Sequence, residues 1–290
     1  MIFGGSATIP FLFMDRETAG PPILNIFLFL ITLITTLLAG TLQQGINPLE
    51  HPGKIWQGIP FSFTLLMILG AHEFGHYIMA RKHHIRVTLP YFIPAPSFIG
   101  TFGAFIKMKS PMMDRRILLD VGAAGPLAGM VVAVPVLFMG LALSEVSPEG
   151  TEAGLVLGSS LFFSLMSWIV HGDLPDQANL ILHPVAFSGW IGLLVTCLNL
   201  LPVGQLDGGH VAYAVFGPRQ RTIAAAVVVI LVVLGVAGWS GWLVWAALLL
   251  FMGVRHPRVV YEWVPLDDSR RVIGWITLAV FVMTFTPAPF

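Results

Sequence analysis

The chain has 290 residues, of which 56% are hydrophobic and only 10% are charged. A soluble domain carries about a quarter charged residues because its surface must be wet. A chain with so few charges cannot cover the surface of a globular domain with polar groups. The composition therefore predicts lipid as the solvent and a single integral membrane domain over residues 1–290. The formal net charge of zero gives no reason to expect nucleic acid as a partner, and the single cysteine excludes an internal disulfide.

Crossing the hydrocarbon core of a bilayer takes roughly 20 apolar residues. The first 22 residues lack a basic n-region and a small-residue cleavage site, so we expect no cleaved signal peptide. The run 158–170 is too short to cross, and we expect it to be interfacial or re-entrant. The sequence therefore predicts an α-helical polytopic membrane protein of about six to seven transmembrane helices, with apolar runs at 23–40, 59–80, 117–143, 184–216 (with a break), 221–238, 241–254 (short) and 272–288.

The basic residues predict the orientation of these spans, since Lys and Arg stay on the cytoplasmic side. With the N-terminus inside, 14 of the 15 basic residues, Arg16 among them, fall on the inner side and only Lys54 falls outside. We therefore expect the N-terminus and the opening of the site on the cytoplasmic side, which is the inner membrane if the cell is prokaryotic. The outer loop 144–182 is acidic instead and carries Glu145, Glu149, Glu152, Asp173 and Asp176.

The segment 85–108 is apolar but cannot form a regular helix, because it contains Pro90, Pro94 and Pro96. Basic residues bracket it on one side of the membrane. Non-helical backbone at membrane depth survives only where protein or a wet cavity satisfies its hydrogen bonds. We therefore expect a re-entrant β-hairpin or sheet whose apolar edge can pair with an extended peptide. A surface loop lying on the headgroups is the alternative.

The motif His72-Glu73-Phe74-Gly75-His76 lies inside the second predicted span. Its two histidines are four residues apart on a helix, so both imidazoles face the same way and can bind one zinc ion. In such motifs the adjacent glutamate, here Glu73, serves as a general base. Burying one Glu and two His without a function costs several kcal/mol, which disfavours the alternative of an ion-pair or proton-relay cluster.

Zinc needs a third protein ligand, and the later spans offer few candidates. The stretch from Asn199 to His210 is the polar cluster within the run 184–216, and Pro202 and its glycines break the helix there. Asp207 is costly at that depth unless it is paired or ligating, and His210 is the competing ligand. At 1.5 Å per residue, His72 and Asp207 each lie about 14–15 Å from the cytoplasmic boundary, so the two clusters reach a similar depth.

These two motifs make the sequence similar to the site-2 protease family of intramembrane zinc metalloproteases. The matching residues are Ala71 to His76 and Asn199-Leu200-Leu201-Pro202 running into Leu206-Asp207-Gly208-Gly209-His210. The segment Gly122-Ala123-Ala124-Gly125-Pro126-Leu127-Ala128-Gly129 resembles the family's Gly-Pro segment, and the hairpin resembles its membrane-inserted β segment. The resemblance implies a catalytic core over 59–253, a re-entrant hairpin at 85–108, and a C-terminal loop and extra span at 254–290.

By position, the resemblance implies that His72, His76 and Asp207 hold one Zn²⁺ per chain and that Glu73 is the catalytic base. Asn199 would orient the substrate or stabilise the oxyanion, with a helix–helix hydrogen bond as its structural alternative. The substrate implied is a transmembrane segment of another protein, cleaved in regulated intramembrane proteolysis within the lipid bilayer. The loop 144–182 is too short for the PDZ domain that many members carry, so a compact form is expected.

Other readings of the same residues stay open at this point. A zinc transporter or metal sensor would need ligands along a full path across the membrane, whereas the polar cluster lies in the cytoplasmic half. A membrane protease acting on prenylated peptides would carry a later acidic helix motif that is not visible here. We expect His83 and His84 to be interfacial, and solvated or capping roles for His51, His171, His183 and His256. Nothing in the sequence indicates an oligomeric state.

Overall fold

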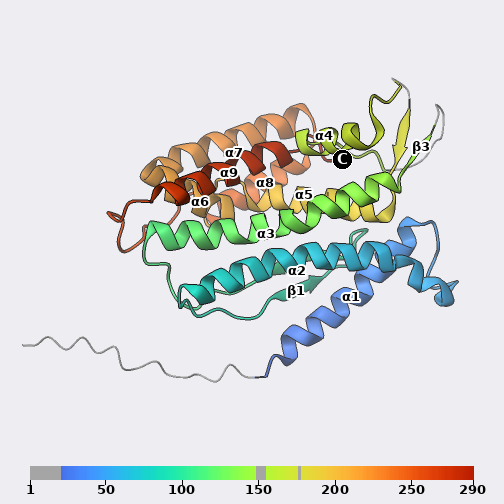
Figure 1. The fold of residues 1–290 in the computed structure, drawn as a ribbon, viewed down its shortest axis with the longest axis horizontal. Coiled ribbons are helices and arrows are strands. Elements are labelled where there is room, and N and C mark those ends of the chain that lie inside the picture. Colours follow the sequence, from blue (N-terminus) through green and yellow to red (C-terminus); the bar gives the residue numbers. More distant parts are fainter. Residues whose placement is uncertain (1–20, 148–154, 176–177) are drawn as a thin grey trace, which may run out of the picture.

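The structure is a computed structural model that describes residues 21–147, 155–175 and 178–290. The expectations about a signal peptide, Arg16, Glu149, Glu152 and Asp176 fall outside the described residues. Figure 1 shows two long helices side by side through the middle of the molecule, with one helix and a β-hairpin on one side of them and the remaining helices on the other.

Helices dominate the described residues. They are α1 (Ile23–Gln43), η1 (Pro52–Gly58), α2 (Ile59–Lys82), α3 (Arg115–Ala142), α4 (Leu161–His171), α5 (Pro184–Asn199), α6 (Asp207–Phe216), η2 (Gly217–Arg219), α7 (Gln220–Ala237), α8 (Gly241–Met252) and α9 (Asp268–Thr284). Within the described residues, four helical stretches are long and apolar enough to cross a membrane, namely Ile23–Gln43, Pro52–Lys82, Arg115–Ala142 and Asp207–Ala237. Helices α4, α5 and α8 are apolar but shorter. A mostly helical fold with several candidate membrane spans is confirmed.

The predicted break in the run 184–216 is present between α5 and α6. Residues 200–206 are not helical, and Gly204 adopts a φ of +57°, which favours glycine. At Gly208 a Cβ would lie 1.9 Å from the carbonyl oxygen of Leu200, so only glycine allows the new helix to start so close to the old one. A second glycine with positive φ, Gly217, separates α6 from α7.

The segment after α2 forms the expected hairpin, with β1 (Tyr91–Pro94) antiparallel to β2 (Thr101–Phe105) and a register shift between Phe92 and Pro94. A bridge between Val87 and Met108 extends the pairing. The hairpin packs on α1, where the Thr35 hydroxyl donates to the carbonyl of Gly100 over 2.6 Å. The prediction of a β-hairpin is therefore confirmed, and the segment is not a loop without regular structure.

A second pair of short strands, which the sequence pattern did not predict, joins the ends of the loop between α3 and α5. Strand β3 (Glu145–Ser147) is antiparallel to β4 (Asn179–Ile181). Between them lies α4, which occupies the run expected to be interfacial or re-entrant and buries Met166 against the core. The 3-10 helix η1, between α1 and α2, was likewise not predicted.

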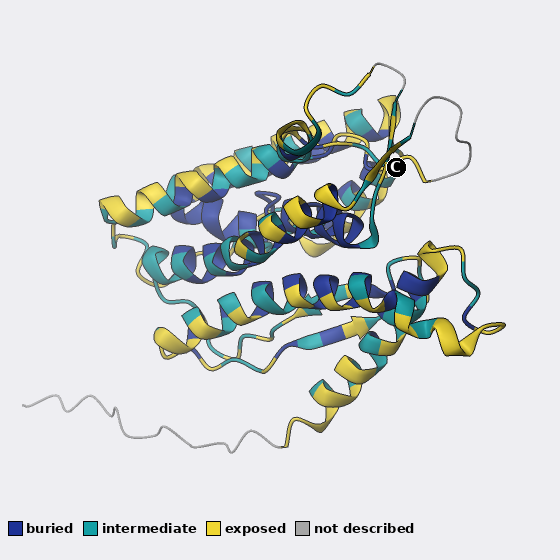
Figure 2. Ribbon diagram, turned by 45° about the vertical axis from the view of Figure 1, so that its right-hand side comes forward, coloured by how far each residue is buried: buried dark blue, intermediate teal, exposed yellow. Residues whose placement is uncertain are grey.

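Burial is concentrated where helices face one another, while the outer faces are exposed and apolar (Figure 2). On α1, for example, Ile23 is 68% and Phe27 57% exposed. Apolar side chains displayed along whole helices would aggregate in water but are solvated by lipid. The central pair α2 and α3 packs closely because Gly75 lies against the backbone of Ala124, where a Cβ would come within 2.5 Å of a carbonyl oxygen.

A charged cluster joins three helices at the end of α2 that carries Arg81. Asp120 of α3 accepts hydrogen bonds from His83, just after α2, over 2.8 Å and from Arg270 of α9 over 2.7 and 2.9 Å. Asp267, the N-cap residue of α9, pairs with the same Arg270. His83, expected to be an interfacial residue, is thus a partner of a largely buried carboxylate. We call His83, Asp120 and Arg270 the clamp.

Candidate metal centre

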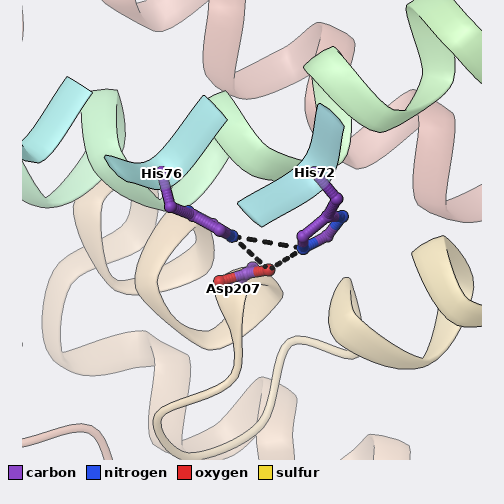
Figure 3. A group of neighbouring side chains, drawn as sticks. All are labelled: His72, His76 and Asp207. Carbon is purple, nitrogen blue, oxygen red and sulfur yellow. Dashed lines mark hydrogen bonds and ion pairs between the residues drawn. The ribbon is translucent and has the colours of Figure 1, made fainter. Parts of the chain in front are cut away.

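The motif histidines lie on one face of α2, as their spacing predicts. His72 and His76 are both buried, and their ring centroids are 4.9 Å apart. Figure 3 shows both imidazoles pointing toward the same carboxylate, that of Asp207. The helix of the motif therefore presents two nitrogen ligands to one point in the interior.

Asp207 reaches this point because it is the first residue of α6. A carboxylate is favoured there, since the free N–H groups and the dipole of a helix N-terminus attract negative charge. Its Oδ2 lies 3.1 Å from Nε2 of His76 and 3.3 Å from Nε2 of His72. These contacts bring the two clusters together across 131 residues of chain, as a similar depth in the membrane would require.

The three ligand atoms have the separations that a zinc ion requires. The two Nε2 atoms are 3.2 Å apart, which closes a nearly equilateral triangle with Asp207 Oδ2. A tetrahedral zinc ion with bonds of about 2.0–2.1 Å separates its ligand atoms by roughly 3.3–3.4 Å. Two imidazoles and one carboxylate are also donors that zinc favours, and they leave a fourth position for water or substrate. The residues present fit zinc.

A backbone carbonyl of α3 orients the second histidine. Nδ1 of His76 lies 2.8 Å from the carbonyl oxygen of Val121, and a carbonyl can only accept, so Nδ1 carries the proton. The lone pair of Nε2 is then directed toward the ligand triangle, as in zinc sites whose histidines are held by a second hydrogen bond. Pro126 of α3 has no N–H, so the carbonyl of Gly122, the residue after Val121, lacks its usual helical hydrogen bond.

Two glycines of α3 make room for the imidazoles. A Cβ at Gly125 would lie 2.0 Å from Nε2 of His76, and one at Gly129 would lie 3.3 Å from Cβ of His72. The sequence pattern indicated packing and helix shape for Gly125 and Pro126. In the structure Gly125 leaves the space that the ligand ring of His76 occupies.

Glu73 and Asn199 both lie at the site. The Glu73 carboxyl is buried and interacts electrostatically with His72, His76 and Asp207. The side-chain nitrogen of Asn199, at the end of α5, lies 3.4 Å from Nε2 of His72. The structure thus brings all five residues that the sequence singled out into one place.

His210, the competing ligand, is not directed to the triangle. Its Nδ1 lies 2.7 Å from Nε2 of His256, whose ring also stacks on Tyr213 with centroids 4.6 Å apart. Burial lowers the pKa of His256, so this ring is neutral near pH 7. A solvated or capping role was expected for His256, and the structure shows a partner of His210 instead. No sequence signal links these two residues.

Comparison with known proteins bears directly on this site. The family model described as peptidase family M50 matches residues 60–238, which include α2 with its motif and Asp207. The chain belongs to peptidase family M50. The resemblance to the site-2 protease family is thereby confirmed, and with it the assignment to a family of zinc metalloproteases with a His-His-Asp candidate metal site.

Plant proteins are among the relatives of this M50 chain. It is 29% identical over 241 residues to "Probable zinc metalloprotease EGY2, chloroplastic" of Arabidopsis thaliana, a match that covers 80% of this chain and 42% of the relative. It is 30% identical over 244 residues to "Probable zinc metalloprotease EGY1, chloroplastic" of the same organism, a match that covers 73% of this chain and 44% of the relative. The match to EGY1 of Oryza sativa subsp. japonica is 34% identical over 165 residues, covering 55% and 28%.

The chain spans less than half the length of these curated relatives. No solved structure matches the chain.

Proposed function

We propose that this chain is an intramembrane zinc metalloprotease that hydrolyses peptide bonds within or near transmembrane segments of other membrane proteins. The observation that carries the proposal is the triangle of His72, His76 and Asp207, which is buried among apolar helices long enough to cross a bilayer. Such a site acts on a polar peptide bond only if the substrate comes to it at the depth of the membrane. We therefore propose that the reaction is a step of regulated intramembrane proteolysis.

In the proposed site, His72, His76 and Asp207 hold one zinc ion. Zinc, when bound, supplies a Lewis acid that polarises a peptide carbonyl and activates water. Glu73 accepts the proton that the attacking water loses and later donates it to the nitrogen of the departing amine. The C–N bond breaks as the new C–O bond is completed, so one water is consumed for each peptide bond cleaved.

Asn199 is proposed to act on the substrate. Its amide lies beside His72, where its N–H groups can donate to the scissile carbonyl oxygen as negative charge develops there. A purely structural Asn199 would instead form a helix–helix hydrogen bond with His72. Asn199→Ala removes the donor in both roles, so the measurement has to separate them. Loss of a helix–helix hydrogen bond lowers the thermal stability, whereas loss of oxyanion stabilisation lowers the cleavage rate of a protein that unfolds at the wild-type temperature.

The hairpin is proposed to present the substrate. A peptide bond in a helix is shielded because its carbonyl is hydrogen-bonded within the helix. The substrate must therefore unwind, and an extended segment can be held by pairing its backbone with the edge of the β1–β2 hairpin. The end of β2 is close to the site, since the backbone of Ile106 makes a hydrogen bond with Glu73.

We propose a single membrane domain over 1–290 with a catalytic core at 59–253, a re-entrant hairpin at 85–108 and an additional span at 254–290. In this topology six to seven helices cross the bilayer, α5 and α6 together forming one interrupted span. The N-terminus and the opening of the site face the cytoplasm. The basic residues at the ends of the spans support this orientation.

Glu73→Gln tests the proposed chemistry, because the amide keeps the shape of the side chain but cannot accept the proton. We expect purified Glu73→Gln to retain one zinc per chain and to lose cleavage of a membrane-embedded reporter helix. Glu50→Gln, an exposed change in the loop after α1, is the matched control and should match the wild type. Cleavage by Glu73→Gln at the wild-type rate would refute the role of Glu73, and absence of zinc from the wild-type chain would refute the metal site.

A further inference from the structure

The residues after α9 form an extended segment that packs against α5, α8 and the turn of the β1–β2 hairpin. We call residues 285–290, Phe-Thr-Pro-Ala-Pro-Phe, the strap. Phe285 leaves the helix in an extended conformation, with φ −64° and ψ 125°, and its ring stacks on that of Trp242 with centroids 5.4 Å apart. In Figure 1 the end of the strap lies next to α4 and α5. The strap is thus an extended peptide packed against helices.

Hydrogen bonds hold the strap by its backbone. The indole N–H of Trp242 donates to the carbonyl of Pro287 over 2.6 Å, and the N–H of Gly158 donates to the carbonyl of Pro289 over 3.0 Å. Trp190 in turn donates to the carbonyl of Gly158 over 2.8 Å, which fixes that segment against α5. Binding through main-chain groups is how grooves recognise extended peptides of varied sequence.

An aromatic cluster receives the last side chain of the strap. The ring centroid of Phe290 lies 5.3 Å from that of Trp190, 5.6 Å from that of Phe98 and 5.9 Å from that of Trp239. Phe98 belongs to the turn of the β1–β2 hairpin, and Gln43 of α1 donates to its carbonyl over 2.9 Å. Phe290 therefore bridges the hairpin turn to α5 and to the start of α8.

The other end of the strap lies at the level of the metal centre. The backbone of Thr286 makes a hydrogen bond with the thiol of Cys197, and both residues are buried. Cys197 precedes Asn199 by two residues on α5, and Asn199 contacts His72. The strap consequently follows α5 from the depth of the site to the hairpin turn.

We propose that the strap closes the protein to substrate by holding the hairpin turn against α5 through Phe290. A substrate segment that pairs with the hairpin has to insert beside it, so the strap has to leave before the substrate enters. The effect on cleavage rests on the function proposed above. The contacts that hold the strap in place do not.

Cys197 reports on the strap because it is the single cysteine of the chain and the strap covers it. Labelling of a buried thiol by a membrane-permeant maleimide follows the fraction of molecules that are locally open. Gly158→Ala should expel the strap, since a Cβ there would lie 1.8 Å from the carbonyl oxygen of Ala288. Phe290→Ala removes the aromatic contact without adding a steric clash.

We expect both variants to label Cys197 about tenfold faster than the wild type, because each raises the population of the open form. Gly53→Ala is the matched control: no atom lies within 4 Å of its added Cβ, and it should label like the wild type. If both variants label Cys197 at the wild-type rate and unfold at the wild-type temperature, the proposal that the strap covers Cys197 and opens is wrong. If one variant fails to fold, the other decides the question alone.

Cleavage of the reporter helix tests whether the strap controls entry. Both variants should cleave several times faster than the wild type, whereas faster labelling with unchanged or slower cleavage would overturn the closing role. The labelling is repeated in the Glu73→Gln chain, where the same ratios are expected. A wild-type chain that does not cleave would contradict the proposed function, while the labelling ratios still decide whether the strap opens.

Discussion

Two pairs of histidine rings lie close together among the described residues, and only one of them belongs to the candidate metal centre. His72 and His76 share the carboxylate of Asp207, and their Nε2 atoms lie 3.2 Å apart with Asp207 Oδ2 closing the triangle. His210 and His256 lie 2.7 Å apart in a direct hydrogen bond. Asp207 and His210 are on the same helix, one turn apart.

The difference lies in what completes each pair. The first pair has a carboxylate and a carbonyl, that of Val121, which directs the Nε2 lone pair of His76 into the triangle. In the second pair, Nδ1 of His210 and Nε2 of His256 are hydrogen-bonded to each other. The remaining ring nitrogen of His256, Nδ1, lies 2.5 Å from the carbonyl oxygen of Pro257. Two histidines within reach of one another do not by themselves offer three ligands. We propose that the acidic third ligand, Asp207, decides which pair binds zinc.

The largest effect should come from exchanging the residues that distinguish the pairs. Asp207→Ala is expected to lower zinc affinity by more than about 100-fold, since loss of even a residue that only hydrogen-bonds to a ligand costs about 10–100-fold. His210→Ala, one turn further along α6, should keep one zinc per chain. Metal analysis of the purified proteins, followed by competition with a chelator, measures both. Equal zinc loss in the two variants would contradict the distinction.

A smaller effect is expected from filling the space beside His76. Gly125→Ala places a Cβ 2.0 Å from Nε2 of His76, so the ring must move, and zinc affinity should fall by about 10–100-fold. The control is Gly70→Ala on α2, where the added Cβ meets no atom within 4 Å. Chelator competition again provides the measurement. If Gly125→Ala bound zinc as tightly as Gly70→Ala, the ring would have room that the structure does not show.

The smallest effect concerns the second pair and pH. Burial lowers the pKa of His256 below the ordinary value of 6.5, so the unfolded chain takes up a proton that the folded chain resists. Stability should therefore be constant above pH 6.5 and fall as the pH drops below that value, by less than about 1 kcal/mol because the ring is partly solvated. His256→Gln should flatten this slope in thermal unfolding between pH 8 and 5. An identical slope in both proteins would show that the pH dependence of stability comes from groups other than His256.

Local rules were enough to predict the two histidine ligands and to name Asp207 as a candidate, and the family resemblance selected Asp207 over His210. The spacing of His72 and His76 on a helix places them on one face, and the cost of an unpaired Asp207 at membrane depth indicates that it has a partner. The helix break was predictable from Pro202 and the glycines after it, and the hairpin from its prolines. Each of these inferences depends on residues close together in the chain.

Features made by distant segments could not be predicted in this way. Gly125 leaves space for His76 only because α3 packs on α2 in one register, and His256 meets His210 only because the chain after α8 returns over α6. The strap depends on three separate segments that meet Phe290. A single sequence gives no measure of such contacts, since many registers satisfy the same hydrophobic pattern.

The clamp has a consequence for dividing this protein into parts. The family match ends at residue 238, yet Asp120 inside it is held by Arg270 outside it. A fragment that stops at residue 238 would leave the Asp120 carboxylate, whose side chain is only 11% exposed, with His83 as its remaining partner in the clamp. Removing one partner of a buried ion pair costs about 3–5 kcal/mol. A fragment that ends where the family match ends should therefore be less stable than one that includes α9.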